Sequence, residues 1–290
     1  MAAAPLAQEW LHGPWRCPVN HSSAEAGSIH NPATAQALGF RGGAVAGSIH
    51  LEQFLPLLEQ RLGQGWQRTG CISMGFRQAS IDGEPVRASV AVQANAQGQW
   101  ALAMHTQKGL LVMDGTATAS ADAQGAVRRW LQRCKPGAPA RMLAAVPVGL
   151  ALGPLPARVR MADITRRLTD ITEPRPEFTD ATRFGGCVAP LSAAVHALRV
   201  LESVLPLAGG PFVGLFGAIE WQYLNGPVLA DHDYTASGRV LAITDSPRSE
   251  MLWLASTLHD PATGTDVARM LMLSRLLKNS SPLWTTTDSP

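Results

Sequence analysis

The feature that most constrains how this chain can fold is an internal repeat. A glycine-rich stretch, RGGAVAG at residues 41–47, precedes an apolar pattern of helical spacing, and FGGCVAP at residues 184–190 precedes a second one. Apolar residues that recur at helical spacing with few charges predict buried helices. The residues expected on the buried faces are Leu51, Phe54, Leu55 and Leu58 in the first copy and Leu191, Val195, Leu198 and Leu201 in the second.

Strand-like sequence follows each predicted helix. Residues 76–92 and 221–241 share one layout: a strand-like start, a glycine-containing turn, and a Pro-Val pair that leads into a long alternating strand. Further strands are expected at residues 100–106, 110–120, 251–259 and 267–275. An antiparallel sheet wrapped on a central helix is the simplest way to bury such a helix.

The two copies therefore predict an α+β fold of two antiparallel sheets, each wrapped on a long central helix and joined edge to edge as a pseudo-dimer. We expect an N-terminal unit at residues 1–125, a linker at 126–142 and a degenerate C-terminal copy at 143–290. The basic cluster of the linker, Arg128, Arg129, Arg133 and Lys135, is expected to be solvated, and a role in holding substrate phosphates is the alternative. Such a pseudo-dimer is complete as a monomer or pairs into a homodimer.

Composition narrows the class of protein. The formal net charge is +2 and the basic residues are scattered, so we expect no nucleic-acid partner. The apolar run at residues 142–155 is short and broken by prolines and a glycine, which argues against a membrane span. Four widely spaced cysteines without a CxxC pair indicate free thiols rather than a zinc site. With no secretory signal at the N-terminus, we expect a cytoplasmic protein.

One segment of the N-terminal copy, residues 24–48, resembles a known family. The residues that carry the resemblance are His30-Asn31-Pro32, Ala35, Leu38-Gly39-Phe40, Gly42 and Gly47. The segment resembles the MaoC-like, (R)-specific enoyl-CoA hydratase branch of the hotdog superfamily, in its double-hotdog form. The resemblance implies reversible hydration of enoyl thioesters, or dehydration of 3-hydroxyacyl thioesters, in fatty acid or polyketide metabolism. The acyl group would be carried by coenzyme A or an acyl carrier protein, and no cofactor is needed.

The resemblance also implies roles for particular residues. His30 stands at the position of the catalytic histidine, and Glu25 stands five residues upstream, where the family has an aspartate. Together they would hold a water and transfer protons near neutral pH. The start of the central helix would bind the thioester oxygen through free N–H groups. The residues assigned to this oxyanion and substrate site are Gly43, Gly47, Ser48 and Asn31.

The C-terminal copy departs from this pattern. It reads EPRPEF at residues 173–178, so that Phe178 stands where the histidine would be. Without a titratable group this copy cannot transfer a proton. The resemblance therefore implies a single active site, built on the N-terminal copy and walled by the C-terminal one.

Other readings of the chain remain open at this stage. Hotdog thioesterases place an acidic residue on the central helix, so a thioesterase using His50 or Glu52 is one alternative, and a polyketide-type cyclase is another. A non-catalytic acyl-binding protein is a third. His196 is expected to lie in the core or to line the pocket. Residues 231–234 (DHDY) resemble a metal cluster, but strand alternation would scatter their side chains, so no metal is expected.

Overall fold

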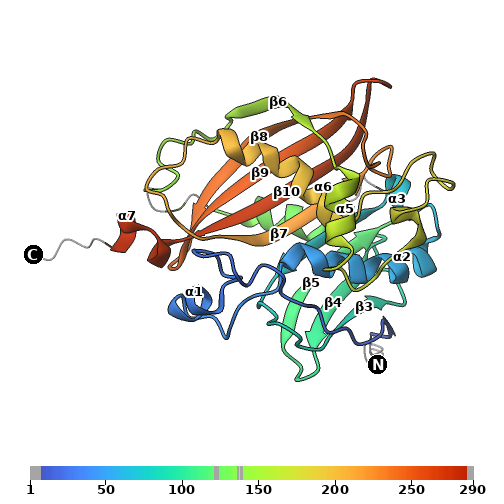
Figure 1. Ribbon diagram of the computed structural model, residues 1–290, viewed down its shortest axis with the longest axis horizontal. Coiled ribbons are helices and arrows are strands. Elements are labelled where there is room, and N and C mark those ends of the chain that lie inside the picture. The colour runs from blue at the N-terminus through green and yellow to red at the C-terminus, as the bar shows by residue number, and fades with distance from the viewer. Residues whose placement is uncertain (1–7, 121–123, 136, 138–139, 286–290) are drawn as a thin grey trace, which may run out of the picture.

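A single sheet runs through both copies of the repeat. The computed structural model describes residues 8–120, 124–135, 137 and 140–285. Its ten antiparallel strands follow the order β1-β3-β4-β5-β2-β7-β10-β9-β8-β6 and curl around the helices (Figure 1). The expected layout of one helix and one set of strands per copy is therefore present. The first residues of the predicted N-terminal unit and residues 136, 138 and 139 of the predicted linker lie outside the described residues.

The N-terminal copy supplies one end of the sheet. Its strands are β1 (Trp10–His12), β2 (Cys71–Phe76), β3 (Val86–Ala91), β4 (Trp100–Thr106) and β5 (Leu111–Thr118). Its helical segments are α1 (Pro32–Ala37), η1 (Gly47–Phe54), α2 (Leu55–Leu62) and α3 (Trp66–Thr69). The strands expected at residues 100–106 and 110–120 are confirmed by β4 and β5.

The C-terminal copy supplies the other end. Its strands are β6 (Ala151–Ala157), β7 (Gly214–Tyr223), β8 (Tyr234–Asp245), β9 (Ser249–Asp260) and β10 (Thr265–Leu277). Its helical segments are α5 (Met161–Arg167), η2 (Pro176–Phe178), α6 (Leu191–Leu198), η3 (Arg199–Val204), η4 (Lys278–Ser280) and α7 (Pro282–Thr285). The strands expected at residues 251–259 and 267–275 are confirmed by β9 and β10.

The two sheets expected to join edge to edge meet at a seam between the copies, where they form one sheet. Strand β2 pairs with β7 from Cys71↔Gln222 to Gly75↔Ala218, which makes the sheet continuous. Beyond Gly75 the two strands part, because the next N–H groups of the N-terminal copy, at Arg77 and Gln78, bond to Val112. The sheet therefore has an opening at one end of its seam.

The central helices are buried as predicted, but neither is one regular α-helix. All eight residues expected on the buried faces are at most 1 % exposed. In the N-terminal copy the 3₁₀ segment η1 precedes α2, whose second residue is Pro56. Proline removes an N–H group and clashes with the carbonyl four residues earlier, so a regular helix is interrupted here. In the C-terminal copy α6 continues as the 3₁₀ segment η3 and stops before Pro206.

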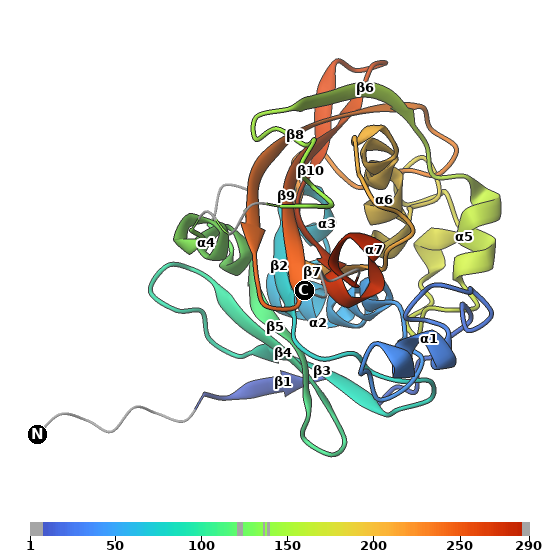
Figure 2. The same ribbon diagram turned by 90° about the vertical axis from the view of Figure 1, so that its left-hand side faces the viewer.

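The predicted solvated linker contains an ordered helix, α4 (Ala126–Arg133), and this corrects the sequence-based expectation. Figure 2 shows α4 on the face of the sheet opposite to α2 and α6. Val127 and Trp130 pack there against a second apolar cluster, in which the Trp130 and Trp253 rings meet edge to face at 5.6 Å. Several arginines surround the short apolar side of this helix, so the segment has a polar composition, and a solvated linker was expected for that reason.

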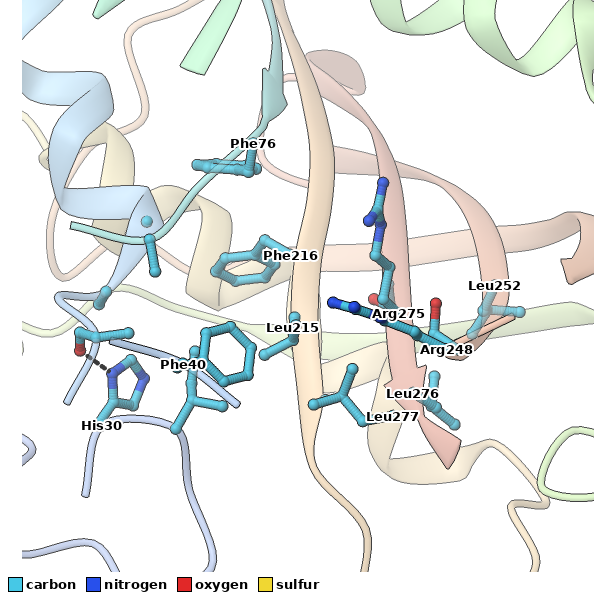
Figure 3. A pocket seen from close by; sticks show the side chains of 18 of the residues that line it. His30, Phe40, Phe76, Leu215, Phe216, Arg248, Leu252, Arg275, Leu276 and Leu277 are labelled. Atoms are coloured by element: carbon cyan, nitrogen blue, oxygen red, sulfur yellow. Dashed lines mark hydrogen bonds between the residues drawn. The ribbon is translucent and has the colours of Figure 1, made fainter. Parts of the chain in front are cut away.

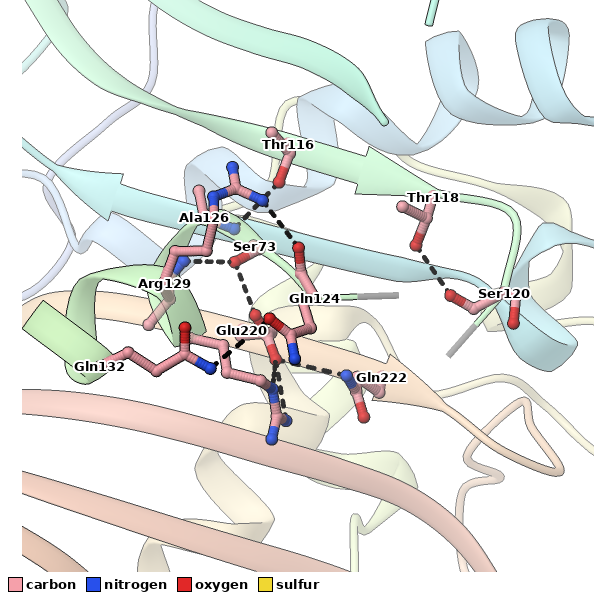
Figure 4. A network of polar contacts seen from close by, with 12 residues as sticks. Ser73, Thr116, Thr118, Ser120, Gln124, Ala126, Arg129, Gln132, Glu220 and Gln222 are labelled. Carbon is pink, nitrogen blue, oxygen red and sulfur yellow. Dashed lines mark hydrogen bonds and ion pairs between the residues drawn. The ribbon is translucent and has the colours of Figure 1, made fainter. Parts of the chain in front are cut away.

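Polar contacts anchor α4 across the seam (Figure 4). The Val127 N–H donates to Ser73 Oγ on β2 at 2.8 Å, and that hydroxyl donates to Glu220 Oε2 on β7 at 2.9 Å. Arg128 completes an ion pair with Glu220 at 3.0 Å. Because Ser73 and Glu220 face each other in the strand register, α4 fastens the two copies where they join.

The described residues also bear on three expectations about a metal site, the cysteines and a membrane span. Residues 231–233 precede β8 rather than belonging to it, and Asp231 and Asp233 both pair with Arg158. No group of metal-binding side chains is found in the described part of the chain. Cys17, Cys71, Cys134 and Cys187 are free thiols. In the same residues, no helix is long and apolar enough to cross a membrane.

Candidate functional site

A cavity of about 790 Å³ lies between the two copies, at the open end of the seam. The N-terminal copy contributes the loop that carries His30, the start of η1 and the end of β2. The C-terminal copy contributes the α6–η3 helix, the starts of β7 and β9, and the end of β10. Figure 3 shows His30 at one end of this space and aromatic and aliphatic side chains along it. The cavity therefore needs both halves of the chain.

His30 lines the cavity in a defined orientation. Its Nδ1 lies 2.7 Å from the carbonyl oxygen of Ala44. A carbonyl only accepts hydrogen bonds, so Nδ1 carries the proton and, in the neutral ring, Nε2 keeps the free electron pair. Figure 3 shows this second nitrogen on the side of Phe40. The loop thus presents a base to the cavity and fixes its tautomer.

The residues beside His30 shape the loop. A Cβ added at Gly43 would lie 2.6 Å from the carbonyl oxygen of His30, so only glycine lets the two segments pass this closely. Asn31 caps helix α1, accepting from the Thr34 N–H at 3.1 Å and donating to the Ser23 carbonyl at 3.0 Å. Neither Gly43 nor Asn31 lines the cavity. The structure thus gives both residues, predicted to bind substrate, roles in holding the His30 loop.

Glu25 is not brought together with His30. It lies in an exposed turn, and it is not among the residues that line the cavity. Its side chain forms no hydrogen bond or ion pair with the residues that the structure describes. The predicted Glu25–His30 pair, with a water between them, is therefore not formed in this structure. Sequence spacing placed Glu25 five residues before His30, but the backbone turns between Glu25 and Ser28 and leaves Glu25 exposed.

The start of the central helix does face the cavity. Gly47 lines it together with Ala46, and the first turn of a helix leaves backbone N–H groups without intrahelical partners. A Cβ at Gly47 would lie 2.8 Å from the Phe76 ring, so this glycine leaves room for a cavity-lining aromatic side chain. Ser48 points elsewhere: its side chain is fully buried and does not line the cavity.

Two further histidines line the same space. His50 on η1 forms a 2.7 Å hydrogen bond with Ser80, and burial lowers the pKa of His50 to about 4. His196 on α6 packs edge-on against Phe216 at 6.4 Å. Burial, with Arg167, Arg199 and His30 nearby, lowers the pKa of His196 to about 3. Both rings are therefore neutral near pH 7, and His196 reaches the cavity from the C-terminal copy.

Glu52, the other secondary candidate, lies outside the cavity. It is fully buried, and its Oε1 accepts a 2.7 Å hydrogen bond from the Ser192 N–H at the start of α6. Burial raises the pKa of Glu52 to about 7. The carboxyl group therefore caps the second central helix instead of facing the space where a thioester would bind.

Comparison with solved structures identifies the fold of this chain. No family model and no curated protein matches the chain. A conserved hypothetical protein from Mycobacterium tuberculosis with a double hotdog fold matches at 14 % identity, covering 93 % of this chain and 96 % of its own, with a TM-score of 0.59. A MaoC domain protein described as a dehydratase, from Chloroflexus aurantiacus, matches at 12 % identity, covering 93 % and 95 %, with a TM-score of 0.58. The fold is the double hotdog. The MaoC-like resemblance of the His30 segment is thereby confirmed at the level of the fold.

The two hotdogs can be aligned through equivalent backbone hydrogen bonds. Ala44 donates to Ile29, and Val188 donates to Glu177 in the same way; Val45 donates to Ser80 as Ala189 donates to Val228. These bonds make His30 equivalent to Phe178, Ser80 to Val228, and His50 to Ala194. Phe178, Val228 and Ala194 are all buried. The second hotdog thus replaces each polar group of the first site by an apolar core residue.

The same alignment pairs Glu52 with His196. His196 lines the cavity of the first hotdog, whereas Glu52 accepts a hydrogen bond from the start of α6 in the second. Beside the closed second position, Arg175 forms ion pairs with Glu59 and Glu177, which are 12 % and 5 % exposed. The double hotdog therefore has an open cavity at the first of the two equivalent positions. The second position is filled by buried apolar side chains, with the ion pairs of Arg175 beside it.

Proposed function

We propose that this double hotdog is a hydratase or dehydratase of enoyl or 3-hydroxyacyl thioesters, with its reaction centre at His30. The observation that carries the proposal is a fixed imidazole, with its free Nε2, at the end of an apolar cavity that also contains a helix N-terminus. A histidine that accepts and returns a proton, beside N–H donors for an oxyanion, is the minimal machinery for this chemistry.

In the proposed reaction the thioester oxygen accepts hydrogen bonds from the N–H groups at the start of η1, near Gly47. His30 Nε2 takes a proton from water as the water oxygen bonds to Cβ of the enoyl group. The protonated ring then returns the proton to Cα, so that water has been added across the double bond. The reverse sequence is dehydration.

The neighbours of His30 support this assignment of roles. His196 and His50 stay neutral near pH 7 because burial lowers the pKa of each ring, so both can donate or accept a hydrogen bond toward bound water. Glu25 lies outside the cavity lining, so the proposal gives the proton transfer to His30 without it. The apolar residues of the C-terminal wall, which include Phe216, Leu252 and Leu276, would contact the bound thioester.

A pair of variants tests the proposal. Crotonyl-CoA and 3-hydroxybutyryl-CoA are offered to the purified protein, and loss or gain of the enoyl thioester absorbance is followed. We expect His30→Ala to reduce turnover about a thousandfold, the range that general acid–base groups supply, with its circular dichroism spectrum unchanged. Glu25→Gln is expected to keep most of the activity. Unchanged turnover in His30→Ala would refute the assignment.

A non-catalytic acyl-binding protein is the second candidate, and the exposed position of Glu25 favours it. It predicts that butyryl-CoA binds while neither crotonyl-CoA nor 3-hydroxybutyryl-CoA is converted. The thioesterase alternative predicts release of free thiol from acyl-CoA. It would have to use a carboxyl group other than Glu52, which caps α6.

A further inference from the structure

The lining of the cavity carries an excess of positive charge. Four arginines line it, at positions 77, 199, 248 and 275, and Glu202 is the one carboxylate among the described lining residues. Arg199 is neutralised by Glu202 at 2.7 Å. The remaining guanidinium groups face a space that is otherwise largely apolar, which favours a ligand with an anionic group.

Two of these arginines meet where the seam opens. Arg77 follows the end of β2, and Arg275 lies on β10. Their guanidinium groups lie 5.5 and 5.7 Å from the centre of the Trp130 ring on α4. The cavity therefore extends from His30, past the end of β7 that does not pair with β2, toward the face of the sheet that the linker helix covers.

The charge of this arginine pair is incompletely balanced. Arg77 forms a 2.6 Å ion pair with Asp114. Arg275 has no ion pair with any residue in the described ranges, and its Nε is buried without a hydrogen-bond partner. Burial, together with like-charge repulsion from Arg77, lowers the pKa of Arg275. An oxyanion between the two guanidinium groups would supply the missing acceptor.

The linker helix extends the positive surface. Arg129 and Arg133 of α4 line a groove of about 580 Å³ that adjoins the opening and also contains Arg77 and Trp130. From one end of the cavity to the other, a ligand would thus meet the base His30, then apolar side chains, and then a cluster of arginines at the surface. That order matches an acyl thioester: reacting carbons, an uncharged arm, and a phosphate.

We propose that Arg77 and Arg275, seated on Trp130 of the linker helix, bind the phosphate of the carrier arm of the acyl thioester. The inference rests on the proposed function for the nature of the ligand. A 4′-phosphopantetheine phosphate is present both in coenzyme A and on acyl carrier proteins, so the chemistry is shared by two sources. Arg129 and Arg133 extend the site toward whatever follows the phosphate.

Calorimetric titration with unreactive thioesters tests the site. Butyryl-CoA carries the phosphates, and butyryl-N-acetylcysteamine has the same acyl group and thioester without them. We expect Arg77→Gln and Arg275→Gln each to weaken butyryl-CoA binding about tenfold, the value of one charge-assisted hydrogen bond, and to leave butyryl-N-acetylcysteamine unaffected. Arg87→Gln is the matched control, because Arg87 also stacks on a tryptophan, Trp15 at 4.6 Å, but lies outside the cavity lining. An unchanged Kd for butyryl-CoA, or an equal loss for both ligands, would overturn the proposal.

Further titrations distinguish the two possible carriers of the phosphate, and further variants keep the test valid if Arg275→Gln does not fold. If butyryl-4′-phosphopantetheine shows the same loss as butyryl-CoA, the arm phosphate is bound, as either carrier would present it. If only butyryl-CoA shows the loss, the nucleotide phosphates are bound and the carrier is coenzyme A. Arg275→Lys should restore part of the affinity. Should Arg275→Gln fail to fold, Arg133→Glu, on the exposed side of α4, is expected to weaken butyryl-CoA alone, and an unchanged Kd would count against the site.

The outcome is independent of turnover. A wild-type protein that converts no thioester but binds butyryl-CoA through Arg77 and Arg275 would overturn the proposed function and leave the phosphate site standing. If the protein hydrates crotonyl-CoA while the arginine variants bind butyryl-CoA normally, the proposed function stands and the phosphate site is refuted.

Discussion

At the scale of single residues, burial decides which titratable groups take part in chemistry. Glu52 and His50 lie on the same helix segment, yet one caps α6 and the other faces the cavity. Their pKa values move in opposite directions for the same reason, because burial penalises whichever form is charged. His30, half-buried and held by the Ala44 carbonyl, keeps an accessible nitrogen at the cavity wall.

Glu52 gives a prediction about pH. Its pKa is raised from 4.5 to about 7, so the stability linked to its protonated form is complete below pH 4.5 and is lost as pH rises through 7. Glu52→Gln cannot titrate. Its free energy of unfolding relative to wild type should therefore rise by about 3 kcal/mol between these two pH values. Urea denaturation at a series of pH values measures the difference. A Glu52→Gln difference curve that is flat between pH 4.5 and 7 would contradict the argument.

At the scale of elements, α4 joins the two hotdogs more firmly than a linker needs to. It contacts both seam strands through the Ser73–Glu220 pair, and it packs on the outer face of the C-terminal copy through Val127 and Trp130. A Cβ at Gly125 would meet the Glu220 carboxylate, so the chain enters this helix at closest approach to the seam. The element that connects the copies in sequence thus also holds them together in space.

Removing the Glu220 carboxylate tests the anchor. In Glu220→Ala, Ser73 loses an acceptor and Arg128 loses its ion-pair partner, so the free energy of unfolding should fall by about 2 kcal/mol. Urea denaturation measures this. Gln132→Ala changes an exposed residue of the same helix, and should lie within about 0.5 kcal/mol of wild type. Equal stability of the two variants would show that the seam contacts contribute nothing.

At the scale of the whole molecule, two similar halves enclose one cavity. The second position is filled by Phe178, Val228 and Ala194, and the ion pairs of Arg175 lie beside it. The asymmetry is built into side chains, since the backbone hydrogen bonds around the two positions are equivalent.

The asymmetry predicts a binding stoichiometry. Calorimetric titration with butyryl-CoA should find one site per chain, because only the first position leaves an open volume. Phe178→His should not add a second site. It should instead destabilise the protein by about 3 kcal/mol, since a polar ring would replace a fully buried phenyl group without a partner. Two equivalent sites in the wild type would contradict this view of the second hotdog.

The sequence by itself determined the repeated layout, the buried faces of both central helices and the strands that follow them. These follow from periodicity, which is a local property of the chain. It also singled out His30, Gly47 and the loss of the histidine at Phe178, since the family pattern lies within one short segment. The register of the seam, the ordered α4 and the exposed position of Glu25 could not be predicted, because each depends on contacts between residues that are distant in the sequence or on the local course of the backbone.

Only the tertiary structure decided what surrounds His30. His196, Ser80 and the Arg77–Arg275 pair come from segments far apart in the chain, and no spacing in the sequence relates them. Their proximity arises because β2 and β7 pair over part of their length and then separate. The base in the cavity is thus local in origin, whereas the enclosing walls and the charged opening exist because two folded halves meet along one seam.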